Sequence, residues 1–207
     1  MYKVLVVDDQ LMVRELIEAY LEESNIFVQV GSIPNAALAE LFCIRTPVDL
    51  VLMDVCTQNN ESGFEATRKI KNSFPNTKVL IMTSMLDFDY IKRAREVGAD
   101  SLWFKEGPKH ELFNVMKKTM QGEEVYPDCV PEVSVGLCFN SDFTPAEIRV
   151  LRLLVEGMTY KEIAEDLYIS PQTVKDHVSR MLQKTGFSSK TKLAAEVASK
   201  RLIVNGF

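Results

Sequence analysis

The amino-terminal stretch reads Val4-Leu5-Val6-Val7-Asp8-Asp9, four apolar residues followed at once by two acids. Such a short apolar run is typical of a strand that is buried on both faces of a parallel sheet. Similar runs recur at residues 28–30, 50–53, 79–82 and 102–104, and amphipathic segments with helical spacing separate them. Repeated strand and helix patterns over residues 3–121 therefore predict an α/β domain, a (βα)5 doubly wound parallel sheet with helices on both faces.

Polar residues follow several of these predicted strands at the point where each strand ends. They are Asp8 and Asp9 after the first strand, Asp54 after the third, Thr83 after the fourth and Lys105 after the fifth. The carboxyl ends of parallel strands meet at one edge of the sheet, which is where ligands bind. Three carboxylates at one edge repel one another unless a cation lies between them, and oxygen ligands without histidine suit Mg²⁺. With a lysine and a hydroxyl nearby to hold phosphoryl oxygens, the cluster predicts attack by a carboxylate on a phosphoryl group.

Residues 1–121 resemble the receiver domain of two-component response regulators. The matching motifs are Val6-Val7-Asp8-Asp9, Val51-Leu52-Met53-Asp54, Ile81-Met82-Thr83-Ser84 and Trp103-Phe104-Lys105. The resemblance implies that Asp54 accepts a phosphoryl group, and that Thr83 and Lys105 contact its oxygens. It also implies that Asp9, Asp54 and the backbone carbonyl of Cys56 bind Mg²⁺ directly, whereas Asp8 binds it through water.

Two positions depart from the pattern of that family. The family usually has Met-Pro after the phosphoacceptor and a glycine eight residues on, whereas here Gly63 stands nine residues after Asp54. The loop between them is therefore one residue longer, and it is more polar. The second departure is Leu102, at the position of an aromatic switch residue that swings inward when the hydroxyl of Thr83 moves. The neighbouring Trp103 is either a substitute for that aromatic or a core residue.

The periodic pattern stops over residues 122–142, where glycines and prolines interrupt the chain, and we interpret this stretch as a linker. Helical patterns resume over residues 143–207 and predict a small all-α domain of four helices. The charge balance changes with the domain. Residues 1–140 carry 14 Lys and Arg against 21 Asp and Glu, whereas residues 141–207 carry 10 against 8. The two parts of the chain are therefore expected to have different electrostatic tasks.

Two of the predicted helices, residues 160–167 and 171–184, have the spacing of a helix-turn-helix. The second has Val174, Val178 and Met181 at helical spacing, so that face must turn to the core. Its opposite, polar face is then exposed, and a helix of that diameter fits the major groove of DNA. The stretch therefore predicts a DNA-reading helix.

The carboxy-terminal part resembles the LuxR-type helix-turn-helix domain of the NarL/FixJ response regulators. The matching stretches are residues 143–147, 156–164, 169–178 and 184–186. The resemblance implies base or phosphate contacts from Lys175, Asp176 and Ser179, and places Thr173, Arg180 and Lys184 near the DNA backbone. If Asp176 touches DNA, its carboxylate should accept a hydrogen bond from a cytosine amine, because it repels phosphate.

Composition excludes several classes of protein. No stretch approaches the roughly 20 consecutive apolar residues of a membrane span, and acids follow the first apolar run where a signal peptide would continue. The four cysteines form no CxxC pair, which argues against a structural zinc site and against a disulfide framework. We therefore expect a cytoplasmic protein that does not contact membranes.

Together these patterns predict a non-enzymatic, two-domain transcription factor that a sensor histidine kinase switches by phosphorylating Asp54, and that binds double-stranded DNA as a homodimer. One alternative is an atypical regulator of the same fold that binds DNA without phosphorylation. A second is a Mg²⁺-dependent phosphohydrolase, but Cys56 stands where such an enzyme needs a second carboxylate as general acid. A third, a protein-interaction adaptor, does not account for the basic stretch at residues 170–192.

Overall fold

The computed structural model describes residues 1–84, 89–105, 108–200 and 202–203. The described residues divide into an α/β unit, residues 1–84 and 89–128, and a helical unit that begins at residue 129. The stretch interpreted as a linker is shared between them, since residues 122–128 pack with the first unit and residues 129–142 with the second.

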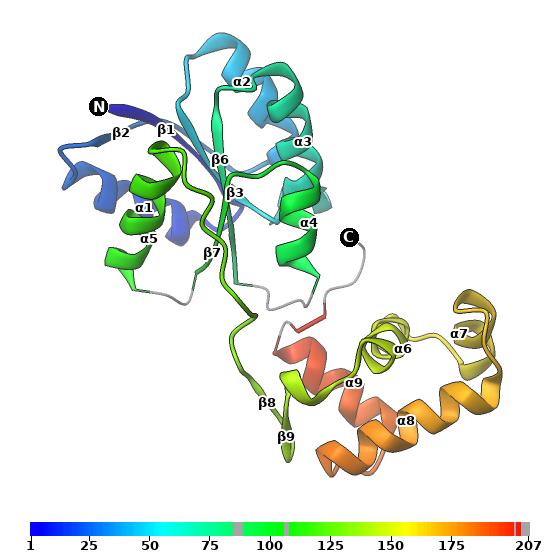
Figure 1. Ribbon diagram of the computed structural model, residues 1–207. Helices are drawn as coiled ribbons and strands as arrows, with labels where there is room; N and C mark the ends of the chain where they lie inside the picture. The colour runs from blue at the N-terminus through cyan, green and yellow to red at the C-terminus, as the bar shows by residue number, and fades with distance from the viewer. Residues whose placement is uncertain (85–88, 106–107, 201, 204–207) are drawn as a thin grey trace. The chain divides into compact units, whose positions relative to one another are not determined.

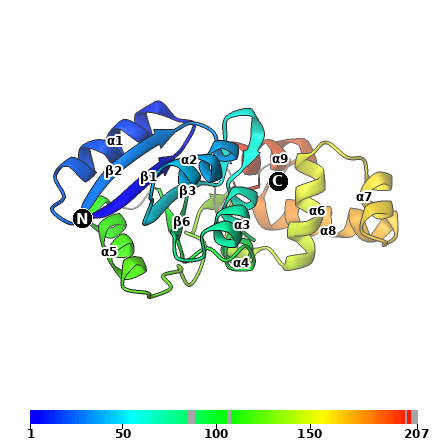
Figure 2. The ribbon, with the colours of Figure 1, turned by 90° about the horizontal axis from the view of Figure 1, so that it is seen from above.

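The α/β unit is a five-stranded parallel sheet with the strand order β2-β1-β3-β6-β7. Its strands are β1 (Tyr2–Val7), β2 (Phe27–Ile33), β3 (Leu50–Asp54), β6 (Lys78–Thr83) and β7 (Ser101–Phe104). Its helices are α1 (Leu11–Glu22), α2 (Ala39–Arg45), α3 (Gly63–Ser73), α4 (Tyr90–Glu96) and α5 (Lys109–Met120). Helices α1 and α5 cover one face of the sheet and α2, α3 and α4 the other (Figures 1 and 2). The predicted doubly wound α/β fold is confirmed.

Alternation along the strands sends side chains into two separate cores. On the α1 and α5 side, Val4 and Val6 of β1 pack with Leu50 and Leu52 of β3 and with Trp103 of β7. Leu5, Val7, Val51 and Met53 point to the other face, toward α2 and α3. Because both faces are covered, the strands read as continuous apolar runs rather than as alternating ones. This is why the short apolar runs located the strands.

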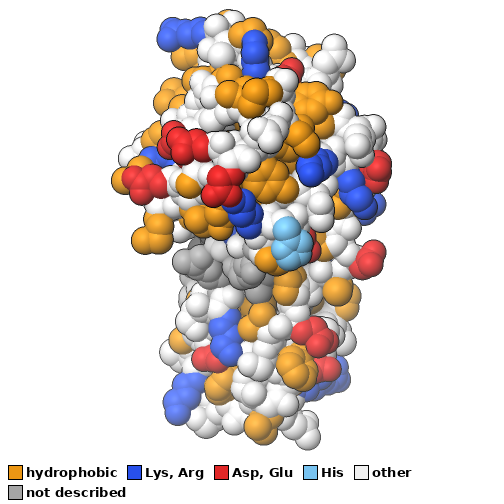
Figure 3. All heavy atoms as spheres, turned by 90° about the vertical axis from the view of Figure 1, so that its left-hand side faces the viewer, with side chains coloured by type: hydrophobic (Ala, Val, Ile, Leu, Met, Phe, Trp, Pro, Cys, Tyr) orange, Lys and Arg blue, Asp and Glu red, His pale blue; other side chains and the backbone are white. Residues whose placement is uncertain are grey.

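The outer side of α1 carries large apolar side chains. Leu11, Met12 and Leu16 are 60%, 80% and 49% exposed, and Figure 3, which looks at the α1 and α5 side, shows apolar side chains there among charged ones. Exposed apolar side chains that gather on one helix are typical of contact surfaces.

The chain that follows α5 returns to the edge strand β7. The Leu102 N–H donates to the Val125 carbonyl at 2.9 Å, and the Val125 N–H donates to Ser101 Oγ at 3.2 Å. The guanidinium of Arg95 in α4 lies 4.4 Å from the centre of the Tyr126 ring, a cation–π contact. These contacts cover the backbone of an otherwise open sheet edge.

The helical unit contains α6 (Pro145–Val155), α7 (Tyr160–Asp166), α8 (Pro171–Thr185) and α9 (Lys190–Ser199). Capping boxes start α6 at Thr144 and α7 at Thr159, and the side chains of Ser170 and Ser189 cap α8 and α9. Helix α8 contacts α6, α7 and α9, and these helices form the predicted all-α domain. No helix in the described part of the chain is long and apolar enough to cross a membrane.

A short antiparallel pair, β8 (Ser134–Val135) with β9 (Cys138–Phe139), precedes α6. The turn between these strands packs against the end of α8, because the Leu137 N–H donates to the Thr185 carbonyl at 3.0 Å. Gly136 has φ +64° and lies so close to that carbonyl that a β-carbon would come within 2.0 Å of the oxygen. Glycine is therefore required at this turn.

Candidate functional site

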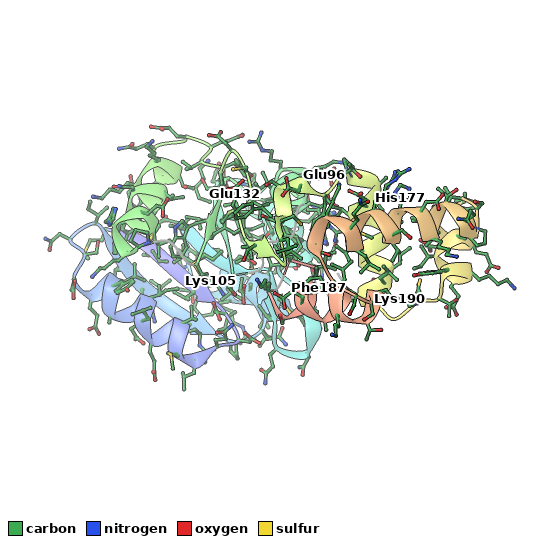
Figure 4. The ribbon with its side chains drawn as sticks, turned by 90° about the horizontal axis from the view of Figure 1, so that it is seen from below. Glu96, Lys105, Glu132, His177, Phe187 and Lys190 are labelled. Atoms are coloured by element: carbon green, nitrogen blue, oxygen red, sulfur yellow. The ribbon has the colours of Figure 1, made fainter. Side chains whose placement is uncertain are left out.

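The predicted polar cluster is assembled at the carboxyl edge of the sheet. Lys105, directly after β7, extends its ammonium to Asp8 Oδ2 at 2.6 Å and to Asp54 Oδ1 at 3.0 Å (Figure 4 labels Lys105). Asp8 and Asp54 are buried and Asp9 is exposed, and one ligand oxygen of each carboxylate lies within 4.8 Å of the others. The structure thus brings together the three acids and the lysine that strand-end spacing singled out.

Electrostatics at the cluster favours an added cation. Burial raises the pKa of Asp54 to about 7, against the attraction of Lys105, and the charges of Asp8 and Asp9 push the pKa in the same direction as burial. One lysine therefore does not balance the three carboxylates. The grouped donors are three carboxylates, and oxygen ligands of this kind fit a hard divalent cation such as Mg²⁺.

Asp8 is held in place by hydrogen bonds that the sequence did not predict. Its Oδ1 accepts the Gln10 N–H at 2.9 Å, and its Oδ2 is the one bound to Lys105. The guanidinium of Arg14 in α1 donates to the backbone carbonyl of Asp8 at 2.5 Å. Sequence reasoning missed Arg14, although a basic residue six positions after Asp8, in the first turn of the following helix, was a usable signal.

The longer loop after Asp54 folds into a small hairpin, β4 (Cys56–Thr57) with β5 (Glu61–Ser62). Thr57 is buried, and its hydroxyl accepts the Ala36 N–H and donates to the Glu61 carbonyl, both at 2.9 Å. These bonds tie the loop to the segment after β2. Cys56 lies near the acids, since the charges of Asp54 and Asp9 add to the effect of burial in raising the pKa of its thiol.

The hairpin ends where α3 touches β3, the strand that ends with Asp54. A β-carbon on Gly63 would come within 1.9 Å of the Asp54 carbonyl oxygen, so only glycine fits there. The Gly63 N–H donates to the Val55 carbonyl at 2.8 Å. The extra residue is thus absorbed within the hairpin, and Gly63 still begins α3 against Asp54.

The two proposed switch residues are both buried. Thr83 ends β6 with its backbone carbonyl accepting the Lys105 N–H at 2.9 Å, and Leu102 lies two residues before the end of β7. Trp103 packs with the core on the α1 and α5 side, and adjacent strand residues point to opposite faces of the sheet. Trp103 therefore cannot substitute for an aromatic at position 102, and it is a core residue.

In the helical unit, α8 turns Val174, Val178 and Met181 to the core, as its spacing predicted. Lys175, Asp176, Ser179 and Arg180 are exposed on the other side. Thr173 is half-buried near the start of the helix, where its hydroxyl lies 2.8 Å from that of Ser170. His177, labelled in Figure 4, lies on α8, and its ring Nδ1 is buried with no hydrogen-bond partner among the described residues.

Lys184 is set apart from these exposed residues. Its ammonium donates to Glu147 Oε2 at 2.8 Å and to the Asp142 carbonyl at 2.9 Å. Glu147 is buried, and the same oxygen accepts the Thr144 N–H at 2.8 Å. Burial opposes ionisation of Glu147, but the hydrogen bonds from Lys184 and Thr144 outweigh it and hold its pKa below the usual range. Lys184 thus joins the end of α8 to the start of α6.

Known protein families match both the α/β unit and the helical unit. The family described as "Response regulator receiver domain" matches residues 4–117, and "Bacterial regulatory proteins, luxR family" matches residues 141–197. The chain belongs to the response regulators. The regulator combines a receiver domain with a LuxR-type helix-turn-helix, and is a DNA-binding transcription regulator.

Two relatives match the chain over most of their own length. The regulator is 33% identical over 197 residues to the response regulator protein VraR of Staphylococcus aureus, covering 91% of this chain and 92% of VraR. It is 29% identical to the transcriptional regulatory protein LiaR of Bacillus subtilis, covering 99% and 100%. A structure of two RcsB dimers bound to two parallel DNAs has a TM-score of 0.64 at 20% identity, covering 96% and 98%. That likeness shows the shared fold.

Proposed function

We propose that Asp54 accepts a phosphoryl group from the phosphohistidine of a sensor histidine kinase, in a Mg²⁺-dependent reaction, and that this controls DNA binding by a homodimer in the cytoplasm. The observation that carries the proposal is the Lys105 ammonium, within 3.0 Å of both Asp8 and Asp54. We place the receiver at residues 1–121 and the DNA-binding domain at residues 143–207.

The reaction is a transfer between two nucleophiles. An Asp54 oxygen forms a bond to phosphorus while the phosphorus–nitrogen bond breaks and the imidazole leaves. Lys105 exchanges its contact with Asp54 for one with a phosphoryl oxygen, and the Thr83 hydroxyl holds another. Asp54 is buried, so the acyl phosphate forms where bulk water is largely excluded.

The acidic cluster supplies the ligands for Mg²⁺, which when bound neutralises charge on the phosphoryl oxygens. Asp9 and Asp54 are the proposed direct ligands, with the Cys56 carbonyl. Asp8 already accepts hydrogen bonds on both carboxylate oxygens, from Gln10 and Lys105, which supports its role through water. Asp9 is exposed and has no such partner within the described residues, so its oxygens are open to a metal.

The proposed DNA contacts come from the exposed side of α8. Lys175, Asp176 and Ser179 are proposed to enter the major groove, with Thr173 and Arg180 near phosphates. One small helix-turn-helix buries too little surface for high specificity, and dimers that read paired half-sites supply the remainder. The RcsB structure contains dimers on DNA, which is what we propose for this regulator.

Labelling by a small phosphodonor tests the proposal. We expect acetyl phosphate with Mg²⁺ to add one phosphoryl mass to the wild-type protein and none to Asp54→Asn, because the amide is near-isosteric but not nucleophilic. Unchanged melting of the variant would show that its fold is intact. Equal labelling of Asp54→Asn would move the phosphorylation site elsewhere.

A second candidate is the phosphorylation-independent regulator of the same fold. One observation favours it: Leu102 is a buried aliphatic residue at the position of the family's switch aromatic. The same variant separates the two functions. If Asp54→Asn and phosphorylated wild type bind a preferred duplex with equal affinity, DNA binding does not depend on the receiver's chemistry.

A further inference from the structure

The exposed side of α8 carries a pair of residues joined to each other before any DNA arrives. Gln172 Nε2 donates to Asp176 Oδ1 at 2.8 Å, and the two residues stand one helical turn apart. Both residues are exposed. Arg180 stands one turn beyond Asp176, yet within the described residues no ion pair joins the two. Asp176 is thus held by the neutral amide and not by the cation.

The hydrogen bond leaves a defined set of groups for a partner. Gln172 keeps its carbonyl oxygen as an acceptor and one N–H as a donor, and Asp176 keeps its second oxygen as an acceptor. In the major groove, adenine offers an N6 donor beside an N7 acceptor, and cytosine offers an N4 donor. The groups left on Gln172 match adenine, and the oxygen left on Asp176 matches cytosine.

We propose that Gln172 and Asp176 act as one unit that reads an adenine and a cytosine at neighbouring positions of a half-site. The proposal rests on the proposed function only in that α8 is taken as the helix in the groove. The hydrogen bond holds the polar ends of the two side chains 2.8 Å apart, close to the stacking rise of DNA of about 3.4 Å, so the pair can reach neighbouring base pairs. Gln172 is thereby a specificity-determining residue that the sequence resemblance did not assign.

The hydrogen bond to Gln172 lowers the cost of placing the Asp176 carboxylate in a groove lined by phosphates. A carboxylate that leaves water without partners is strongly penalised, and the Gln172 amide supplies one partner in advance. The same bond restricts two flexible side chains to one arrangement, so less conformational freedom is lost on binding. The loss of Gln172 is therefore expected to weaken reading at the position of Asp176 as well as at its own.

The test begins with a randomised pool of double-stranded oligonucleotides, from which the full-length protein, activated with Mg²⁺ and beryllofluoride, selects its preferred duplex. Affinity is then measured on that duplex and on copies with single base-pair changes, for wild type, Gln172→Ala, Asp176→Ala and the double variant. Gln183→Ala is the matched control, because it is an exposed glutamine on α8 with no carboxylate partner in the described residues. Melting curves check that each variant is folded.

We expect the wild type to prefer adenine and cytosine at two adjacent positions by roughly tenfold each. Gln172→Ala should abolish the first preference and reduce the second several-fold, whereas Gln183→Ala should change neither. The double variant should lose less than the product of the two single losses, which is the signature of coupled residues. Independent losses, or no change with Gln172→Ala, would overturn the proposal.

A failure of the proposed function gives a different result. If no duplex is enriched, or if Lys175→Ala and Arg180→Ala leave all DNA affinities unchanged, α8 does not read DNA, and both proposals fall together. If those two variants weaken binding while Gln172→Ala does not alter base preference, only the paired reading is refuted.

Discussion

Asp54 is buried beside two other carboxylates and within reach of one lysine, and these conditions set its acidity. Burial is the largest contribution and raises the pKa of Asp54 to about 7, while Lys105 opposes the rise. A protonated carboxyl is a poor ligand for a divalent cation, so protons and Mg²⁺ compete for Asp54. We therefore expect the proposed binding of Mg²⁺ to depend on pH near neutrality.

We predict that Mg²⁺ binds about tenfold more weakly at pH 6 than at pH 8. The sign follows from the raised pKa: below about pH 7 Asp54 holds a proton that must leave before its oxygen can bind the metal. Titration calorimetry at the two pH values measures the difference. Asp54→Asn, which has no proton to lose, should flatten the dependence, and equal wild-type affinities at pH 6 and pH 8 would contradict the prediction.

For individual residues, the sequence correctly predicted that polar side chains at the ends of neighbouring strands lie close together. Asp8, Asp54 and Lys105 converge because parallel strands finish at one edge, a rule that needs no knowledge of rotamers. The sequence did not predict that Lys184 binds Glu147. Helical periodicity identifies the residues of α8 that face the core, but it does not identify the partner of a half-buried residue beside them. Lys184 and Glu147 lie 37 residues apart in sequence.

Among the elements, apolar runs located the strands of the main sheet, and helical spacing located helices of both units. The hairpin formed by β4 and β5 escaped prediction, because the spacing from Asp54 to Gly63 shows only that the loop is longer. Its shape depends on the bond between the Thr57 hydroxyl and the Ala36 N–H, which joins residues 21 positions apart. The local sequence of neither segment predicts that contact.

The junction of α6 and α8 yields a prediction about Lys184. Lys184→Met should lower the free energy of unfolding of the DNA-binding domain by about 2 kcal/mol, because it leaves the buried Glu147 carboxylate without its cation. For a domain of this size, that loss corresponds to a fall in melting temperature of roughly 8–16 °C. Thermal unfolding followed by circular dichroism measures it.

Salt dependence separates this structural role from a phosphate contact. Arg180→Ala should reduce the slope of log affinity against log salt by about one, whereas Lys184→Met should leave the slope unchanged. The double variant Lys184→Met/Glu147→Leu should recover part of the lost stability, since it removes both charges together. A stable Lys184→Met protein with a reduced salt slope would instead make Lys184 a phosphate contact.

For the molecule as a whole, the receiver and the DNA-binding domain must communicate if phosphorylation is to matter. In the proposed reaction a phosphoryl group on Asp54 would draw in the Thr83 hydroxyl and Lys105. Thr83 ends β6, and Lys105 directly follows the adjacent strand β7. Strand β7 is also hydrogen-bonded at its edge to Val125, in the segment that leads out of the receiver. A shift of β7 therefore reaches both the receiver surface and the start of the connecting segment.

We predict that activation shifts the regulator from monomer toward dimer. Light scattering after gel filtration, at tens of micromolar protein, should show the mean mass rise toward twice the monomer mass when Mg²⁺ and beryllofluoride are added together. Either addition alone should have no such effect, because the phosphoryl mimic needs the metal and Asp54. Asp54→Asn provides the matched control and should stay at the starting mass.

The shift should be incomplete, because Leu102 lacks the aromatic ring of the family's switch residue. Leu102→Tyr, in a variant that remains folded, should raise the dimer fraction. A wild-type mass that stays monomeric at saturating beryllofluoride would refute the switched regulator and leave the phosphorylation-independent one.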